Sequence, residues 1–465
     1  MSEIEKNNDE ILLDLLDRHQ YTAFMREIDE MHPRDAADFF ESLSEKRIPI
    51  VFRLLKKDTA AEIFAELDSD LQEQIIQALS DREVSVMLEE LYTDDVVDML
   101  EEMPAGVVKR IMKNATPETR EEINRFLAYP EKSAGSVMTS EFIDLRKNMT
   151  CDEAVRRIRR IGLDKETVYV AYVTNESRVL EGVVQLKQLL FADPEDIIGD
   201  IMETNIPFAY TYDDRESVAN MISHYDMIAL PIVDKEKRLV GLVTVDDALD
   251  VLETEATEDI EKMAAILPSD KPYLKTGILE TWKKRIPWLL LLMVSATFTS
   301  AIIQGYESAI GTYAILTAFL PMLMDTGGNA GGQASVTIIR GLSLGEITPK
   351  DVLRVLWKEL CVGMFCGLTL AVATFLKVIA LDFRFQFYTT MDNGVAQNNL
   401  LIAAIISITV FFAVLVAKAV GTLLPLGAKR IGLDPAVMAS PFITTIVDTI
   451  ALIIYFAIAS SLLPF

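Results

Sequence analysis

Cysteine and histidine are scarce in this chain of 465 residues, which has three of each. Cys361 and Cys366 lie in an apolar stretch, Cys151 stands alone, and no Cys-x-x-Cys spacing occurs. This usage favours a reducing compartment and excludes a zinc finger or a disulfide scaffold. With so few soft ligands, we expect any bound metal to be held by oxygen atoms, as Mg²⁺, Ca²⁺ and Mn²⁺ are.

Positive charge is scarce in the first 270 residues, which carry 60 acidic and 30 basic side chains, whereas residues 271–465 carry 10 and 14. A surface this acidic repels phosphates and excludes nucleic acid as a partner. The sequence also lacks a Walker motif, a dinucleotide fingerprint and a catalytic triad pattern, so we expect neither an enzyme nor an ATP-driven pump. The N-terminus, MSEIEKNNDE, has no basic region followed by an apolar one, so no signal peptide is predicted.

Residues 10–128 have apolar positions at helical spacing. Asp35, Asp58 and Asp81 are 23 residues apart, and each opens such a segment. Because Asp is favoured near helix N-termini, the spacing predicts stacked helical hairpins in a short solenoid. An irregular helical bundle is the alternative. We assign residues 1–130 to an acidic, all-α, superhelical N domain.

Residues 131–253 contain an internal duplication. The motif GSVM at 135–138 recurs as GDIM at 199–202, and DEAVRRI at 152–158 matches ESVANMI at 216–222, both at an offset of 64. Each copy continues into a β-rich stretch and a short helix, which is typical of a duplicated α/β unit. The run LVGLVTVD in the second copy resembles the CBS domain, so residues 135–197 and 198–253 are expected to form a tandem CBS pair.

The remaining chain changes from acidic to apolar. Residues 254–270 predict an amphipathic acidic helix that is ended by Pro268 and connects to residues 271–465. That last part is predicted to be an all-α membrane domain with five transmembrane helices. The predicted spans are Pro287–Gln304, Thr312–Ile339, Val352–Leu376, Leu400–Leu424 and Ala436–Leu463.

Basic residues predict the orientation of these spans. On one side lie Lys271, Lys275, Lys283, Lys284, Arg285, Arg340, Lys350, Arg354, Lys358, Lys418, Lys429 and Arg430. On the other side lie Lys377 and Arg384. Cytoplasmic loops carry the excess of Lys and Arg. We therefore expect a multi-pass protein of the plasma (inner) membrane with cytoplasmic N-terminal domains and Phe465 outside.

Asp448 is the only charged side chain between Ala436 and Phe465. A carboxylate at membrane depth costs roughly 2.5–3.5 kcal/mol on insertion scales, so it usually faces a polar pathway or a partner. In the second span, Asp325, Asn329 and Gln333 recur every four residues and share one helix face. The glycine-rich backbone around them favours a pore-lining stripe; a small-residue helix interface with polar contacts is the alternative.

Asp434 precedes Pro435, a pattern typical of a helix N-cap, and places a carboxylate at the cytosolic mouth of the fifth span. From end to end the chain resembles the MgtE family of magnesium channels. GGNAGGQ in the second span, the Asp434-Pro435 step and PFITTIVDTIALIIYF around Asp448 carry the resemblance. It implies a homodimer through the CBS and membrane domains, with Mg²⁺ held on the dimer axis by Asp448 of both chains.

The resemblance also implies that intracellular Mg²⁺ closes the channel by bridging acidic faces, with residues 254–270 as the family's plug helix. The expected metal ligands are Asp94, Asp95 and Asp98 of the N domain, Asp226, Asp246, Asp247 and Asp250 of the second CBS unit, Glu255, Glu258 and Asp259 of the connecting helix, Asp434 and Asp448. A solvated acidic surface is the alternative for the cytosolic residues. ATP is a candidate ligand of the CBS pair, although the sequence shows no Gly-rich phosphate loop.

The function predicted from these features is Mg²⁺ uptake across the plasma membrane by a selective channel that intracellular Mg²⁺ closes. A coupled exchanger of Mg²⁺, Co²⁺ or Mn²⁺ is one alternative, and a non-conducting membrane sensor built on the CBS pair is another. Selectivity among Mg²⁺, Mn²⁺ and Co²⁺ stays open, as does the choice of the dominant gating carboxylates.

Overall fold

The computed structural model describes residues 3–269, 273–306, 313–390, 396–438 and 440–463. It divides into two compact units, Met1–Leu252 and Glu253–Phe465. Lys271, Thr312 and Phe465, which entered the span and orientation predictions, lie outside the described residues.

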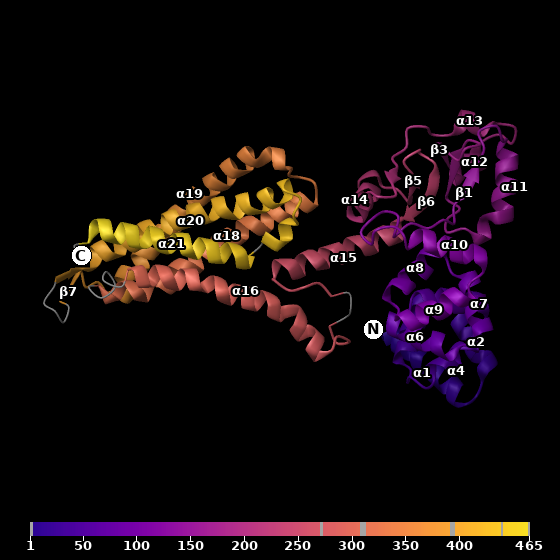
Figure 1. Ribbon diagram of the computed structural model, residues 1–465, viewed down its shortest axis with the longest axis horizontal. Helices are drawn as coiled ribbons and strands as arrows, with labels where there is room; N and C mark the ends of the chain where they lie inside the picture. The colour runs from indigo at the N-terminus through magenta and orange to yellow at the C-terminus, as the bar shows by residue number, and fades with distance from the viewer. Residues whose placement is uncertain (1–2, 270–272, 307–312, 391–395, 439, 464–465) are drawn as a thin grey trace. The chain divides into compact units, whose positions relative to one another are not determined.

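The first unit begins with short helices (Figure 1). They are α1 (Glu3–Asp17), α2 (Tyr21–Asp29), α3 (Pro33–Ser42), α4 (Ile48–Phe52), α5 (Lys57–Ala65), α6 (Ser69–Ala78), α7 (Asp81–Glu90), α8 (Thr93–Glu102), α9 (Ala105–Asn114) and α10 (Pro117–Phe126). Asp35, Asp58 and Asp81 lie in the first turns of α3, α5 and α7, so the three predicted helix starts are confirmed.

These helices stack in two rows. Contacts run from α3 to α5, α7 and α9, and from α4 to α6 and α8. Phe39, Phe40, Phe52 and Phe64 form a chain of edge-to-face ring contacts that links α3, α4 and α5. Each helix is too short to be stable alone, so burial of these apolar faces against neighbouring helices stabilises the stack. The arrangement agrees with the predicted solenoid.

Two α/β units follow with the same strand order, and the predicted duplication is confirmed. The first has β1 (Ile143–Leu145), α11 (Cys151–Ile161), β2 (Val170–Thr174), β3 (Leu180–Gln185) and α12 (Leu186–Phe191). The second, after α13 (Ile198–Ile201), has β4 (Ala209–Tyr210), α14 (Arg215–Tyr225), β5 (Ala229–Val233), β6 (Leu239–Thr244) and α15 (Val245–Met263). In each sheet the first strand pairs in parallel with the second, and the second pairs antiparallel with the third.

The segments that follow the repeated GSVM and GDIM motifs each pair with a strand of the other α/β unit. Thr139, which follows the first motif, bridges Leu242 of β6, and Glu203 after the second motif bridges Val183 of β3. A Cβ added at Gly241 would lie 2.6 Å from the Thr139 carbonyl oxygen. Only glycine permits this approach. The exchanged segments bind the two CBS units into one body.

Helix α15 has no Gly or Pro between Val245 and Met263 and continues without a break across residue 254. The connecting helix predicted over 254–270 is therefore the second half of α15. It ends at Met263 rather than at Pro268, because Ala265 adopts a positive φ of 56° that stops the helix.

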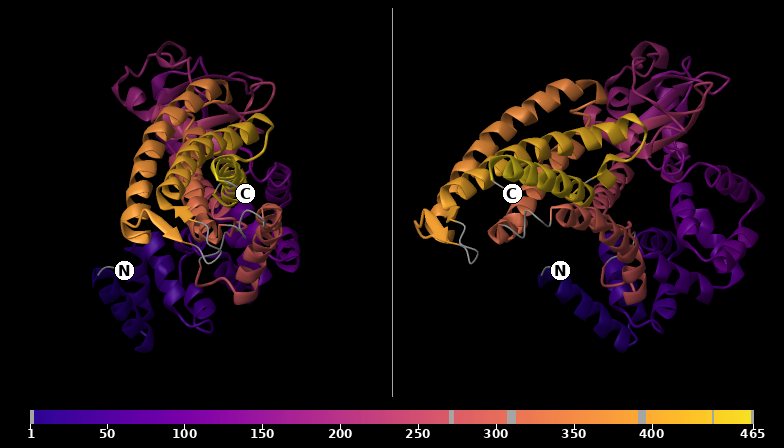
Figure 2. Two further views of the ribbon diagram at one scale, coloured as in Figure 1. Left: turned by 90° about the vertical axis from the view of Figure 1, so that its left-hand side faces the viewer. Right: turned by 60° about the vertical axis from the view of Figure 1, so that its left-hand side comes forward.

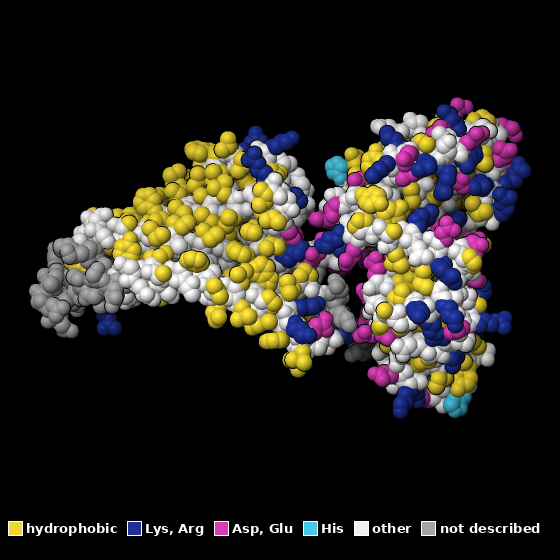
Figure 3. Space-filling view, in the orientation of Figure 1, with side chains coloured by type: hydrophobic (Ala, Val, Ile, Leu, Met, Phe, Trp, Pro, Cys, Tyr) yellow, Lys and Arg dark blue, Asp and Glu magenta, His cyan; other side chains and the backbone are white. Residues whose placement is uncertain are grey.

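The second unit is helical (Figure 2). Its elements are α16 (Ile278–Gly305), η2 (Ala314–Phe319), α18 (Leu320–Ser343), η3 (Pro349–Asp351), α19 (Val352–Lys377), η4 (Val378–Asp382), the hairpin β7 (Tyr388–Thr390) and β8 (Ala396–Asn398), α20 (Asn399–Arg430), η5 (Pro435–Met438) and α21 (Ser440–Leu462). Helices α18, α20 and α21 pack against one another around a core in which Ile402, Ile406 and Val414 are buried. Hydrophobic side chains cover much of this unit's visible face, whereas charged side chains gather over the first unit (Figure 3).

Within the described residues, four segments are long and apolar enough to cross a bilayer: 278–305, 349–382, 399–430 and 435–462. They match four of the five predicted spans. The remaining predicted span falls on α18, whose Gly, Asn, Gln and Asp residues lower its hydropathy, so its membrane-crossing role stays a prediction. Helix α16 begins nine residues before the predicted start, and Pro287 lies inside it rather than at its beginning.

Candidate functional site

Glycines allow α18 to pack closely against α20 and α21. A Cβ added at Gly421 of α20 would collide with the carbonyl oxygen of Gly331. One added at Gly327 would lie 2.9 Å from Val447 Cγ1, and one at Gly328 would lie 3.0 Å from Thr444 Cγ2. Small residues let membrane helices approach closely, and here they bring the α18 backbone against the face of α21 that carries Asp448.

Asp448 meets this glycine-lined surface. A Cβ at Gly328 would lie 3.8 Å from Asp448 Oδ1. That oxygen is buried and has no hydrogen-bond partner among the described residues. Asp325 of α18 lies close enough to repel the Asp448 carboxylate. The carboxylates of Asp325 and Asp448 therefore lie in one region, although they come from two helices. A cation bound there would reduce their repulsion and would give Asp448 Oδ1 a partner.

The predicted stripe on α18 lies on one face. Asp325, Asn329 and Gln333 are all exposed in the single chain, whereas Gly327, Gly328 and the other residues on the packed side are buried. The structure therefore confirms that the three polar side chains share a face that this chain leaves uncovered. No contact joins Asn329 or Gln333 to Asp448 among the interactions of the described residues.

A second group of carboxylates gathers within the first unit. Asp94 and Asp95 of α8, Asp247 of α15 and Glu166 of the first CBS unit lie close enough to repel one another. Glu141 belongs to the same acidic cluster and accepts hydrogen bonds from Thr93 Oγ1 at 2.8 Å and Thr139 Oγ1 at 2.6 Å.

Burial first, and mutual repulsion second, raise the pKa values in this acidic cluster. The pKa of Asp94 lies well above its usual range, that of Asp95 is raised to about 7 and that of Glu166 to about 8. The pKa of Asp247 is raised to about 6, although hydrogen bonds from Thr244 oppose the shift. Asp94 Oδ1 and Glu166 Oε2 are buried without a hydrogen-bond partner in the described part of the chain. Within the described ranges, no ion pair with a lysine or arginine involves any of these four carboxylates.

Asp98 of α8 is electrostatically part of this acidic cluster, because loss of hydration first, and then repulsion by Glu101, Asp247 and Asp95, raise its pKa to about 7. Asp226 lies apart, as an exposed C-cap of α14 with a φ of 52°. Asp246 and Asp250, both exposed on α15, act electrostatically on Asp247. Among the described residues, the structure brings Asp94, Asp95, Asp98 and Asp247 together, and no interaction joins Asp226 to them. Their role as metal ligands stays a prediction.

A third acidic group lies in the second unit, where the end of α15 meets Asp434. Lys262 Nζ lies 2.5 Å from Glu258 Oε1 and 2.5 Å from Asp434 Oδ2. Ser343 donates a hydrogen bond to Asp259 Oδ2 at 2.9 Å. Burial, and then repulsion by Asp434, raise the pKa of Asp259 despite that hydrogen bond. The two predicted ligands Glu258 and Asp434 therefore come together, with a lysine between them.

The donor sets suit a hydrated divalent ion better than a fully protein-coordinated one. Across the described ranges, no three His, Cys, Asp or Glu side chains converge as one set of metal ligands. Mg²⁺ keeps several waters and is usually bound through one or two carboxylates. The orphaned oxygens of Asp94 and Asp448 fit such an ion.

Three residues of these sites escaped the sequence reasoning. Glu141 and Glu166 join the acidic cluster only because the fold brings the first CBS unit beside α8. Lys262 lies one helical turn after Glu258, a spacing that could have indicated an ion pair. Its contact with Asp434, 172 residues away, carries no sequence signal.

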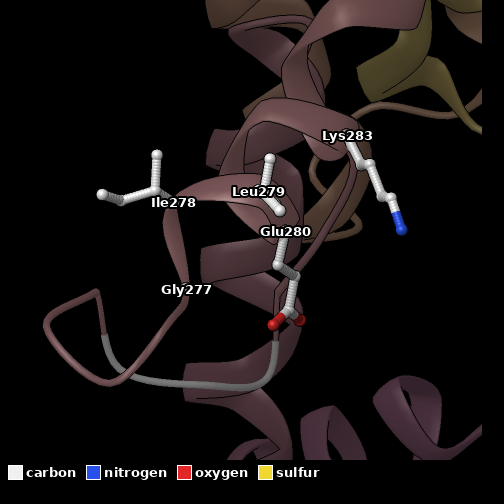
Figure 4. Close-up of a pocket in the computed structure, with 5 residues that line it drawn as sticks. All are labelled: Gly277, Ile278, Leu279, Glu280 and Lys283. Carbon is white, nitrogen blue, oxygen red and sulfur yellow. The ribbon is translucent and has the colours of Figure 1, made fainter.

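A surface hollow at the start of α16 is lined by Gly277, Ile278, Leu279, Glu280 and Lys283 (Figure 4). In this view Ile278 extends to the left, Glu280 points downward and Lys283 points to the right. None of the predicted ion ligands belongs to this hollow, so it takes no part in the sites described above.

Three family models match this chain. Residues 31–132 match the MgtE intracellular N domain, residues 198–254 match the CBS domain, and residues 320–458 match the divalent cation transporter MgtE. The second CBS copy is the one matched, in line with its clearer motif.

Similar proteins extend the match to nearly the whole chain. The magnesium transporter MgtE of Thermus thermophilus is 36% identical over 447 residues, which cover 95% of this chain and 96% of that protein. The crystal structure of the soluble part of a magnesium transporter is 29% identical, with a TM-score of 0.52, and covers 54% of this chain and 99% of that one. The cytosolic domain of the Mg²⁺ channel MgtE in complex with ATP is 36% identical, with a TM-score of 0.49, and covers 52% of this chain and 98% of that one.

The matched family models cover both the acidic helical part and the segments that carry Asp325 and Asp448. The order of the domains is the same as the order of the matched family models. The chain belongs to the MgtE family of magnesium transporters.

Proposed function

We propose that this protein is a magnesium channel that admits Mg²⁺ across the plasma membrane and closes when intracellular Mg²⁺ is high. The observation that carries the proposal is the buried, unpartnered Oδ1 of Asp448 beside the glycine-lined face of α18. A carboxylate in that position is stabilised by a cation that binds or passes there. The names of the relatives as magnesium transporters support Mg²⁺ as that cation, and transport rather than catalysis.

A homodimer would complete the ion path. The exposed stripe of Asp325, Asn329 and Gln333 supports a second copy on this face, because an uncovered polar face in an apolar helix needs a polar neighbour. Twofold symmetry would double each carboxylate. Two Asp448 side chains could then hold Mg²⁺ through its waters and discriminate against monovalent ions.

Closure would depend on the cytosolic carboxylates. In the acidic cluster, Asp94, Asp95 and Asp247 repel one another, and a bound Mg²⁺ would remove that repulsion and hold α8 against the second CBS unit. Further regulatory ligands remain predictions, namely Asp98, Asp226, Asp246, Asp250, Glu255, Glu258, Asp259 and Asp434. ATP binding by the CBS pair is also a prediction.

The domain limits follow from the same proposal. We place the N domain at 1–130, the CBS pair at 131–253, the connecting segment at 254–270 and the membrane domain at 271–465. The N-terminal domains would lie in the cytoplasm and the C-terminus outside.

Mg²⁺ influx into proteoliposomes that contain a Mg²⁺-sensitive dye tests the proposal. The Asp448→Asn variant should lose most of the influx, because an amide cannot replace the carboxylate as a cation ligand. The matched control is Glu346→Gln, an exposed acid of the same unit outside the helices. Wild-type influx in the Asp448→Asn variant would overturn the assignment of the ion path.

The same vesicles separate the alternatives. A channel moves Mg²⁺ down its electrochemical gradient alone, so influx should follow an imposed membrane potential without a proton or sodium gradient. If influx requires a second ion gradient, the protein is a coupled exchanger rather than a channel. Absence of influx from correctly oriented protein would favour the CBS-based sensor.

A further inference from the structure

The contact between the end of α15 and Asp434 includes a positively charged side chain, that of Lys262. We infer that the ammonium group of Lys262 acts as a built-in counter-ion that holds α15 on the membrane unit without bound metal. Mg²⁺ would have to displace this ammonium to bind there. This inference rests on the proposed gating function but concerns a residue outside the predicted ligand set.

Lys262 is centred between two carboxylates. Its Nζ is 2.5 Å from an oxygen of Glu258 and 2.5 Å from one of Asp434. The side chains of Lys262 and Glu258 are 19% and 15% exposed, and that of Asp434 is 35% exposed. Ion pairs withdrawn from water to this degree are screened less than pairs on an open surface.

Local structure fixes both partners of the lysine. Glu258 lies one turn before Lys262 on α15, so the two side chains share a face. Asp434 Oδ1 accepts a hydrogen bond from the Ala436 backbone N–H at 2.8 Å, which leaves Oδ2 for Lys262. The apolar side chain of Met263 packs against Ile339 and Ala436 beside the ion pair. Glu258 and Asp434 are therefore held in place by their own local structure, and the Lys262 ammonium binds between them.

Removal of the lysine charge would change the character of this contact. Asp259 lies near enough to Asp434 to be repelled by it, so without Lys262 three carboxylates would face one another. Like charges at short range favour separation unless a cation lies between them. A divalent ion could then replace the ammonium, because it would bind the same carboxylate oxygens. Contact of α15 with the membrane unit should therefore be metal-independent with Lys262 and metal-dependent without it.

Cross-linking measures this contact without any ion flux. Cysteines at Met263 and Ile339, in full-length protein with Cys151, Cys361 and Cys366 replaced by alanine, would be joined by a short thiol-reactive cross-linker. With Lys262 present, we expect similar cross-linking in EDTA and in millimolar Mg²⁺. In the Lys262→Met variant, cross-linking in EDTA should fall about fivefold, and Mg²⁺ should restore it.

Two variants distinguish a charge effect from a loss of folding. Lys262→Arg keeps the positive charge and should cross-link in EDTA as the parent does. Lys429→Met removes an exposed charge from the last turn of α20 and should change nothing. The inference is overturned if the parent cross-links only in Mg²⁺, or if Lys262→Met cross-links equally in both conditions. Because transport is not measured, either result leaves the test of the ion path at Asp448 unaffected.

Discussion

Lys418 of α20 forms an ion pair with Glu359 of α19, with 3.5 Å between Nζ and Oε2. Both side chains are almost fully buried, at 6% and 12% exposure. A Cβ added at Gly363 would lie 3.2 Å from Lys418 Cγ, so the glycine gives the lysine stem its space. The distribution of basic residues predicts Lys418 on the cytosolic side of the membrane, whereas the structure places it in the interface between α19 and α20.

Breaking this pair should destabilise the membrane unit. Lys418→Met or Glu359→Gln alone leaves an uncompensated buried charge, which costs about 3–5 kcal/mol. The double variant leaves no charge, so its loss of stability should be much smaller than the sum of the two single losses. Thermal unfolding in detergent measures this, with Lys429→Met as an exposed control in the same helix. Additive losses would contradict the coupling.

The glycine contact between α18 and α20 gives a second prediction. Gly421→Ala places a methyl group against the Gly331 carbonyl oxygen, and such overpacking typically costs about 1–3 kcal/mol. The control is Gly427→Ala in the same helix, where an added Cβ meets nothing within 4 Å. That change should be neutral or raise the unfolding temperature, because alanine favours a helix more than glycine does. Equal effects at both positions would contradict the close approach.

The acidic cluster predicts how stability depends on pH. The folded-state pKa values of Asp95, Glu166 and Asp247 are raised to about 7, 8 and 6. Between about pH 4 and 8 the folded protein therefore binds more protons than the unfolded chain, so stability falls as pH rises through that window. Calorimetry of the full-length protein should show a lower unfolding temperature for the first unit at pH 8 than at pH 5.

Magnesium should oppose this loss. At pH 8 Asp95 and Asp247 are mostly ionised, so millimolar Mg²⁺ should raise the unfolding temperature of the first unit more than it does at pH 5, where protons occupy these carboxylates. Asp95→Asn should weaken the pH dependence, and Glu89→Gln, an exposed acid on α7, should not. An unfolding temperature that rises from pH 5 to pH 8 without metal would contradict the raised pKa values.

Membrane orientation is tested by single cysteines in two loops. Phe385, exposed after η4, should react with an impermeant thiol reagent outside intact cells when replaced by cysteine. A cysteine at Glu346, exposed after α18, should react only after permeabilisation. Both variants need a background without the native cysteines. The opposite labelling pattern would reverse the orientation that the basic residues predict.

The sequence predicted those parts of the fold that depend on local pattern. Asp residues 23 apart marked three helix starts, the 64-residue offset revealed two α/β units, and apolar runs located four spans. It missed what only tertiary structure creates. Glu166 and Asp94 are 72 residues apart and approach because two domains pack together, and Lys262 reaches Asp434 across even more chain. The unbroken length of α15 was readable, because no Gly or Pro interrupts it.

The Gly331–Gly421 contact also limits how the membrane unit can move. The carbonyl oxygen of Gly331 in α18 lies where Gly421 of α20 has no side chain. The two helices therefore cannot slide along each other without a collision of backbone atoms. Helices α18 and α20 should therefore move together as one rigid body. Helix α16, by contrast, has no fully buried residue between Ile278 and Gly305 and packs mainly along α21, for example through Trp288 and Phe442. Any movement that reaches the membrane unit through the chain after α15 should therefore shift α16 relative to the fixed pair of α18 and α20.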